Sequence, residues 1–189
     1  MELLKLYLPE GENKEFQIAL VDEPAIESEW HAFNNQHKFK VISDDRRIVS
    51  GYAMIADMLI PRYDAHRGYY NVKFTKQAIE DIVYNFFRNG LNQNTNEMHQ
   101  TGDLAEGVFV FESFILDQSR GIKAPEGFKQ EADGSWFISM KVNNDEVWDK
   151  VKSGEYTGFS IENRFDHVND KEEELKRLLE EIENNIINK

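Results

Sequence analysis

Apolar residues at helical spacing predict two helices in the main part of the chain. Between Thr75 and Asn89 they recur every three or four positions, at Ile79, Ile82, Val83, Phe86 and Phe87. This spacing places them on one face of a helix, which Thr75 caps and Gly90 ends. A shorter helix is predicted from Asn144 to Gly154, where glycine adopts a left-handed conformation at little cost.

Apolar runs and alternating patterns predict strands elsewhere. The predicted strands are Leu3–Leu8, Phe16–Val21, Phe39–Ile42, Ile48–Ile60, Tyr69–Phe74, Val108–Leu116 and Gly134–Val142. The run Ile48–Ile60 is long and apolar, so a central strand ending at Pro61 is expected, followed by a polar loop over Arg62–Gly68. Gly134–Val142 alternates in the way typical of a half-buried antiparallel strand. The pattern therefore predicts an α+β fold with a mostly antiparallel sheet.

The composition changes after residue 168, which predicts a boundary between a domain over residues 1–168 and a tail over residues 169–189. The tail is highly charged, and its apolar residues at helical spacing are Leu175, Leu178, Leu179, Ile182 and Ile186. This predicts an acidic amphipathic helix of about five turns. It either packs on its own domain or pairs with a second helix.

The bulk composition excludes several classes of function. The chain has 189 residues, enough for one domain with a core, and no cysteine, which excludes disulfides, a cysteine nucleophile and thiolate metal sites. A net charge of −13 argues against nucleic-acid binding. No apolar run approaches the ~20 residues of a membrane span, and the N-terminus lacks the pattern of a signal peptide. His31 and His37 lack a metal-ligand pattern and His66 is expected at the surface, so we expect neither metal nor cofactor.

Ser160 is the candidate nucleophile, in the segment Lys150–Phe165. This segment is predicted to end a helix at Gly154 and to enter a strand through a tight Gly-Phe-Ser turn. Gly158 allows the backbone to approach another group closely just before Ser160. A serine at the start of a buried strand, behind a glycine, is well placed for nucleophilic attack. The same pattern also fits an ordinary strand serine, so the motif leaves both interpretations open.

Glu112 is a second residue with an unusual environment, inside the predicted strand Val108–Leu116. Strand alternation puts Glu112 on one face with Val110 and Phe114. An ionised carboxylate between apolar side chains needs a cationic or hydrogen-bonding partner. Alternatively, the strand lies at the edge of a sheet and Glu112 is solvated.

Several segments together resemble one known family. They are ALVDEPAI, MLIPRYDAHR, YNVKFTKQAIEDI, NEMHQ, FVFESFILD, GSWFISMKV, NNDEVWDKVKSG and the following GFSIE. Their order resembles that of the phage prohead proteases, in particular the XkdF-like branch of phage serine proteases, over about Phe16 to Phe165. The resemblance implies a sheet or barrel of the type found in herpesvirus assemblin proteases. It also implies that Ser160 is the nucleophile and His99 the general base. Gln100 departs from the acidic residue expected there.

The resemblance leaves the third catalytic group open. Herpesvirus proteases use a second histidine, whereas other phage members use an acid. Glu112 is the first candidate, and Glu162, Asp166 and His167 are the alternatives. Backbone N–H groups of Gly158–Ile161 and the charge of Arg164 are candidates for stabilising the oxyanion.

The implied activity is a serine endopeptidase of phage head maturation. It would act in the host cytoplasm inside the immature head, cutting the scaffold, the N-terminal part of the major capsid protein and itself. The resemblance implies a homo-oligomer, whereas the acidic charge and the lack of a long apolar run lead us to expect neither nucleic acid nor membrane as a partner. One alternative is a catalytically inactive protease-fold protein that serves as scaffold or head-assembly component. Another is a hydrolase or binding module on an unrelated fold, which a structure without a histidine near Ser160 would favour.

Overall fold

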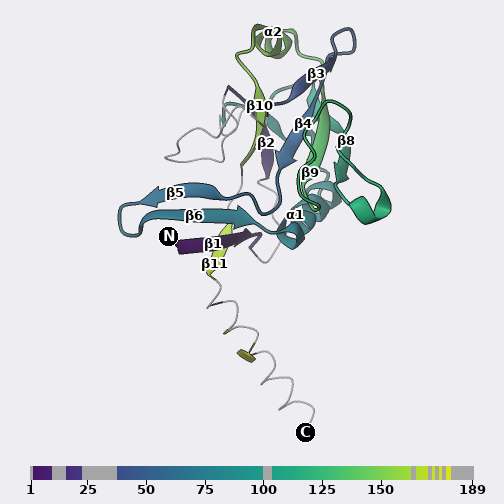
Figure 1. The fold of residues 1–189 in the computed structure, drawn as a ribbon. Coiled ribbons are helices and arrows are strands. Elements are labelled where there is room, and N and C mark those ends of the chain that lie inside the picture. Colours follow the sequence, from purple (N-terminus) through teal and green to yellow (C-terminus); the bar gives the residue numbers. More distant parts are fainter. Residues whose placement is uncertain are drawn as a thin grey trace.

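The computed structural model describes residues 2–9, 16–22, 38–99, 104–162 and 165–169, with the single positions Glu172, Leu175, Leu178 and Leu179. Within these residues the chain forms three β sheets and two α helices (Figure 1). The α+β class is therefore confirmed, with most neighbouring strands antiparallel.

The first sheet joins strands from the two ends of the described chain. Its order is β11 (Asp166–Asn169), β1 (Glu2–Tyr7), β6 (Gly68–Phe74) and β5 (Ile60–Asp64). Strand β1 runs parallel to β6 and antiparallel to β11, so an early and a late segment lie side by side. The buried side chains of Leu4 and Phe74 connect this sheet to the core.

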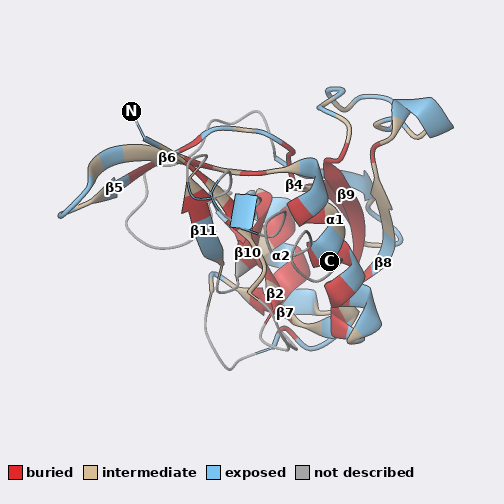
Figure 2. Cartoon of the chain, turned by 90° about the horizontal axis from the view of Figure 1, so that it is seen from below, coloured by how far each residue is buried: buried red, intermediate tan, exposed pale blue. Residues whose placement is uncertain are grey.

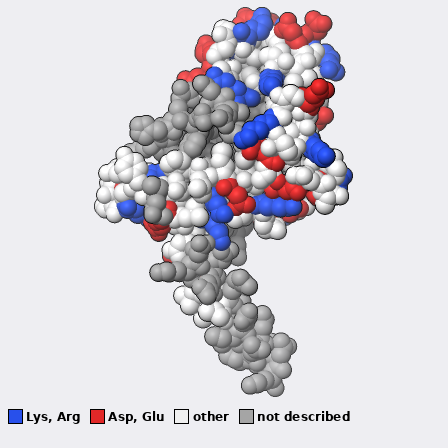
Figure 3. Space-filling view, viewed as in Figure 1, with Lys and Arg blue, Asp and Glu red and all other residues white. Residues whose placement is uncertain are grey.

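The other two sheets form the upper part of the molecule in Figure 1. The three-stranded sheet has the order β10 (Gly158–Glu162), β2 (Gln17–Val21) and β7 (Thr95–Glu97). The four-stranded sheet has the order β3 (Lys40–Ser43), β4 (Ile48–Met54), β9 (Trp136–Val142) and β8 (Val108–Ile115). Charged side chains of both signs are interspersed over this part of the surface (Figure 3).

Helices α1 (Lys76–Arg88) and α2 (Asp145–Ser153) begin and end where the sequence predicts. Thr75 caps α1 by accepting a hydrogen bond from the N–H of Ala78 at 3.2 Å. Asn144 caps α2 in the same way, and Gly154 ends it with a φ of 77°. Two short 3-10 turns, η2 (Leu91–Gln93) and η3 (Gln118–Arg120), complete the helical elements that the structure describes.

One large hydrophobic core joins the sheets and both helices. An aromatic group marks its centre: Phe86 of α1 contacts Phe16 at 5.5 Å and Trp136 of β9 at 5.3 Å between ring centroids. Figure 2 shows α1 with one buried and one exposed face, as the helical spacing predicts. The core therefore fixes β2, which Phe16 precedes, against β9 and α1.

The three-stranded and four-stranded sheets approach each other at two seams. At one, the N–H of Phe39 donates to the carbonyl of Thr157 at 2.9 Å. At the other, the N–H of Ala105 donates to the backbone carbonyl of Thr95 at 2.7 Å. The side-chain hydroxyl of Thr95 in turn donates to the carbonyl of Val108 at 2.6 Å. Neither seam is a ladder of paired strands, so no barrel closes within the described residues. The expected barrel is absent there because β7 is only three residues long and cannot continue along β8.

The predicted long strand Ile48–Ile60 is wrong beyond Met54. β4 ends at Met54, and Asp57 turns the chain with a φ of 57° before β5 begins. The N–H of Asp57 donates to the carbonyl of Phe74, and its carboxylate pairs with Lys73 at 2.6 Å. The predicted loop Arg62–Gly68 is wrong for the same reason, because most of it belongs to β5 and its turn into β6.

The alternation in β8 changes at a bulge. Val110 pairs with Met140 and faces the main core, but Glu112 already pairs with Ser139, so one extra residue stands in β8. Glu112 therefore lies on the opposite face from Val110, together with Phe114. The prediction that Glu112 shares a face with Val110 is wrong because a bulge cannot be read from alternation alone.

The C-terminal tail is described at four positions. Glu172, Leu175, Leu178 and Leu179 are helical, and the three leucines are half exposed. Asn169 and Glu172 exchange side-chain to backbone hydrogen bonds at 3.0 Å, the pattern of a helix N-terminus. The rest of the predicted tail helix lies outside the described residues. No helix in the described part of the chain is long and apolar enough to cross a membrane.

Candidate active site

Ser160 lies in the middle of β10, on the face opposite to the core. Its neighbours Phe159 and Ile161 pack into the main core. Ser160 pairs with Ala19 of β2, and side chains of directly paired residues share a face. The predicted tight turn is therefore wrong: Gly158 already begins the strand, paired with Val21, and Ser160 is held by the ladder on its edge toward β2.

The hydroxyl of Ser160 is buried without a hydrogen bond. The residue is 2% exposed, and none of the described residues bonds to its Oγ atom. Leaving a buried hydroxyl unpaired costs about 1 to 3 kcal/mol. A native protein retains such a group rarely, and a role in catalysis is one reason to do so.

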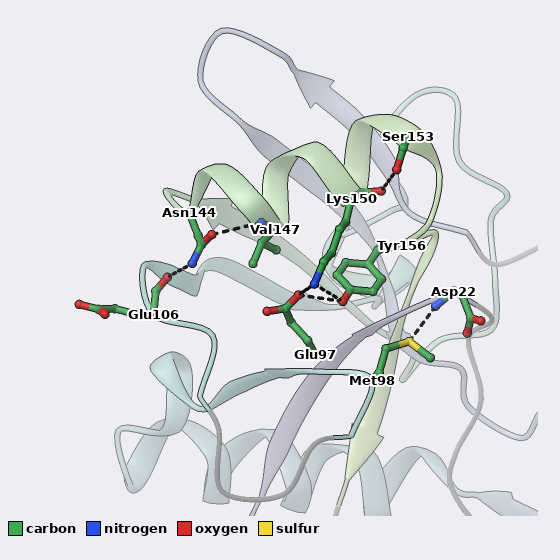
Figure 4. Close-up of polar contacts among 9 residues, drawn as sticks. All are labelled: Asp22, Glu97, Met98, Glu106, Asn144, Val147, Lys150, Ser153 and Tyr156. Carbon is green, nitrogen blue, oxygen red and sulfur yellow. Dashed lines mark hydrogen bonds and ion pairs between the residues drawn. The ribbon is translucent and has the colours of Figure 1, made fainter.

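His99 follows β7 at a strained turn. Met98 and His99 have φ angles of 50° and 57°, in the left-handed region that costs a residue with a side chain about 1 to 2 kcal/mol. The N–H of Met98 donates to Leu20 of β2 at 3.0 Å, and the N–H of Asp22 donates to Met98 Sδ at 3.4 Å (Figure 4). Strand β2 therefore holds this turn in place. Strained backbone of this kind gathers at functional sites.

Strand β2 lies between the two candidate catalytic segments. Ala19 pairs with Ser160 on one side and with Asn96 of β7 on the other, so the backbones of β10 and β7 are about 10 Å apart at this level. Ala19, Asn96 and Ser160 are all buried, so this face of the three-stranded sheet is covered at the level of Ser160. His99 does not hydrogen-bond to Ser160 in this structure. Catalytic hydrogen bonds are often formed only when substrate is bound.

A polar cluster ties the two segments together from another side. Glu97 Oε2 accepts hydrogen bonds from Lys150 Nζ and Tyr156 OH, both at 2.7 Å (Figure 4). Lys150 Nζ also lies 3.2 Å from Tyr156 OH. The hydrogen bond to Glu97 raises the pKa of Lys150 above its usual value. Burial, followed by the bond to Glu97, raises the pKa of Tyr156.

Glu112 is not brought to this site. Its Oε2 accepts a 2.5 Å hydrogen bond from Ser139 Oγ, which lies 2.7 Å from Ser50 Oγ. These three residues form a row across the four-stranded sheet on the face away from the main core. Strand β8 is at the edge of that sheet and Glu112 is exposed, so the solvated alternative describes it. We therefore do not retain Glu112 as the third group.

The other candidates for the third group lie elsewhere or outside the description. Asp166 and His167 are exposed in the first sheet, where His167 Nε2 lies 3.2 Å from Arg67. The described part of the chain does not include Gln100, Arg164, His31, His37 or the side chain of Glu162. His66 is exposed at the turn between β5 and β6, as expected.

Sequence reasoning missed two features of this region. The sequence gives no sign that Asp22, just after β2, contacts the His99 turn, but its backbone N–H donates to Met98 Sδ there. The cluster of Glu97, Lys150 and Tyr156 was also missed. Lys150 and Tyr156 lie in the segment around Ser160, but nothing in their spacing points to Glu97, 53 residues before Lys150.

Other parts of the described surface do not contribute to this site. No group of three or more metal-ligating side chains occurs among the residues that the structure describes. A groove of about 730 Å³ lies between α1 and β8, lined by Phe87, Phe111 and Arg120 among others. Ser160 and His99 do not line it.

Comparison with known proteins identifies a family. A family model with the description "Putative phage serine protease XkdF" matches residues 35–169, which include both Ser160 and His99. No curated protein and no solved structure matches the chain.

Proposed function

The chain belongs to the XkdF family of phage serine proteases, and on this premise we propose that it is a serine endopeptidase with Ser160 as nucleophile and His99 as general base. The observation that carries this assignment is the buried hydroxyl of Ser160, which bonds to none of the described residues. A structural serine at this position would be expected to satisfy its hydroxyl, as Ser139 does.

The proposed reaction is the standard sequence of acyl transfer. His99 takes the proton from Ser160 Oγ as the oxygen attacks the scissile carbonyl, and then gives that proton to the leaving amine. Water, activated by His99 in turn, hydrolyses the acyl-enzyme and restores the hydroxyl. For the first step the imidazole of His99 must come within hydrogen-bonding distance of Ser160 Oγ, which we expect to happen when substrate binds.

The oxyanion donors follow from the pairing of β10. In an antiparallel pair, alternate N–H groups of β10 bond to β2. The intervening N–H groups in Gly158–Ile161 point away from β2. These are the backbone donors that we assign to the oxyanion.

Asp22 is our candidate for the group that orients His99. It directly follows β2, and its backbone N–H donates to Sδ of Met98, the residue before the proposed base. A carboxylate next to an imidazole fixes its tautomer and stabilises the imidazolium formed during attack. Asp22→Asn should lower kcat by about 10² to 10⁴-fold, by analogy with other orienting carboxylates. Thermal stability should change little, because the side chain is exposed. A kcat within threefold of wild type would remove Asp22 from the mechanism.

The biological substrates that we propose are the phage scaffold and the N-terminal part of the major capsid protein, cut inside the immature head in the host cytoplasm. The phage origin of the family supports this setting. The acidic tail over residues 169–189 would serve as a docking or scaffold-like element and as a site of self-cleavage, and the enzyme would act as a homo-oligomer.

The test is co-expression with the neighbouring capsid and scaffold proteins, read by intact mass. Wild type, Ser160→Ala and Ser153→Ala are compared, the last being an exposed serine at the end of α2. Fragments should appear with wild type and with Ser153→Ala, and should be absent with Ser160→Ala. Labelling of the purified proteins with a fluorophosphonate probe gives a second reading that does not depend on the substrate.

The alternative is a protease-fold protein without activity that serves in head assembly. The low exposure of Ser160 favours it, because a residue that is 2% exposed is closed to a peptide substrate in this structure. Under this alternative the three samples give identical masses, and assembled heads leave Ser160 unlabelled by the fluorophosphonate.

A further inference from the structure

We infer that Glu97, Lys150 and Tyr156 form a positioning cluster that holds the His99 turn and the Ser160 strand in a fixed relation; this rests on the proposed function. None of the three is assigned to contact substrate. Their role is to place the two residues that do.

The cluster stands at short chain distances from both catalytic residues. Glu97 ends β7 two residues before His99, and Tyr156 precedes Ser160 by four residues in the link from α2 to β10. Lys150 comes from the last turn of α2. One carboxylate oxygen therefore receives donors from the segment that leads to the nucleophile while it belongs to the segment that leads to the base.

The cluster differs from the surface ion pairs around it. Tyr156 is 3% exposed and belongs to the main core, and the Glu97 side chain is 25% exposed. By contrast, the pair of Lys152 with Asp149 on α2 is 50% and 74% exposed and joins neighbouring turns of one helix. A partly buried group with three mutual contacts restrains its neighbours more than an exposed pair does.

The remaining described backbone links between the two segments pass through β2. Met98 bonds to Leu20, and Thr157 bonds to Val21, each at the end of that strand. The cluster adds a direct connection that bypasses β2. Without it, the segments can shift independently along β2, and a displacement of about 1 Å can reduce a rate by 10²-fold.

The test uses Tyr156→Phe and Glu97→Gln, with Lys152→Gln as the matched control. Tyr156→Phe keeps the ring in the core and removes only the hydroxyl. The fluorophosphonate labelling rate of Ser160 should fall by about 10 to 100-fold in both variants, with KM for a peptide substrate changed less than kcat. The control should stay within twofold of wild type.

Hydrogen exchange of the full chain, read by mass spectrometry, separates this inference from the proposed function. Tyr156→Phe should lower protection at both the Met98 and the Thr157 N–H groups, whereas Lys152→Gln should leave both unchanged. If protection at Met98 is unchanged, the inference is overturned whatever the activity. If protection falls but the wild-type labelling rate is retained, the cluster does not position the catalytic residues and the inference fails. If protection falls and wild type itself is never labelled, the mechanical link stands and the proposed function fails.

Discussion

Removing the hydroxyl of Ser160 should abolish activity and make the protein more stable. The hydroxyl is buried and has no described partner, so Ser160→Ala removes a desolvation cost of about 1 to 3 kcal/mol. It also removes the contacts of one oxygen atom, each worth about 0.1 to 0.2 kcal/mol. The net gain should be about 1 kcal/mol, which raises Tm by about 2 to 4 °C for a chain of this size.

Ser139→Ala is the matched control for this measurement. Ser139 is also 2% exposed in a strand, but its hydroxyl bonds to both Ser50 and Glu112. Alanine at position 139 removes one hydrogen bond from the buried hydroxyl of Ser50 and one from the carboxylate of Glu112. Stability should therefore fall by about 1 to 3 kcal/mol, so the two serine-to-alanine variants should change Tm in opposite directions.

The assay is thermal and urea unfolding of wild type and the two variants in the same buffer. Equal m values are required, so that the midpoints report stability rather than a change in the unfolded state. If Ser160→Ala lowers Tm as much as Ser139→Ala does, the Ser160 hydroxyl is bonded in solution. The argument that it is held unpaired for catalysis would then be refuted.

Three further predictions concern the surroundings of the site. Gly134→Ala should destabilise by about 2 to 4 kcal/mol in urea unfolding, because φ is 90° and a Cβ would lie 2.7 Å from that of Lys76. Ala19→Val should slow fluorophosphonate labelling by about tenfold or more at temperatures where the variant is folded, because Ala19 is buried and paired with Ser160, so a larger side chain would crowd the nucleophile. An unchanged rate would contradict this placement of Ser160. The pKa values of Tyr156 and Lys150 are raised on folding, so their contribution to stability is present below about pH 10 and is lost as pH rises further. The Tm should therefore fall less steeply from pH 8 to 11 in the double variant Tyr156→Phe with Lys150→Met than in wild type. An equal fall in Tm would argue against the cluster.

Local signals in the sequence were sufficient for the helices. Each signal acts within a few residues of its own position: the cap at Thr75, the apolar face through Ile82 and the glycine at 154. The local sequence therefore contains all that determines where these helices begin and end. The strand containing Trp136 was also predicted, but not its burial: β9 lies between β4 and β8 and is buried on both faces rather than half-buried.

The parts that could not be predicted depend on distant partners. The bulge in β8 arises from the register with β9, and strand β5 forms because β6 pairs with it. The contact of Glu97 with Tyr156 joins positions 59 residues apart. The site shows the same division: Ser160 and His99 were named from the resemblance, whereas the placement of Glu112 away from them required the structure.

The position of β2 between β7 and β10 has a consequence for the timing of synthesis. Residues 17–21 leave the ribosome well before their partner on one side, which ends at residue 162. That is 141 residues after residue 21, which takes about 7 to 28 s at 5 to 20 residues per second. Until then the nucleophile strand has not been made and β2 has one neighbour. Under the proposed function, activity cannot appear during this interval, because the strand that carries the nucleophile has not yet joined the sheet.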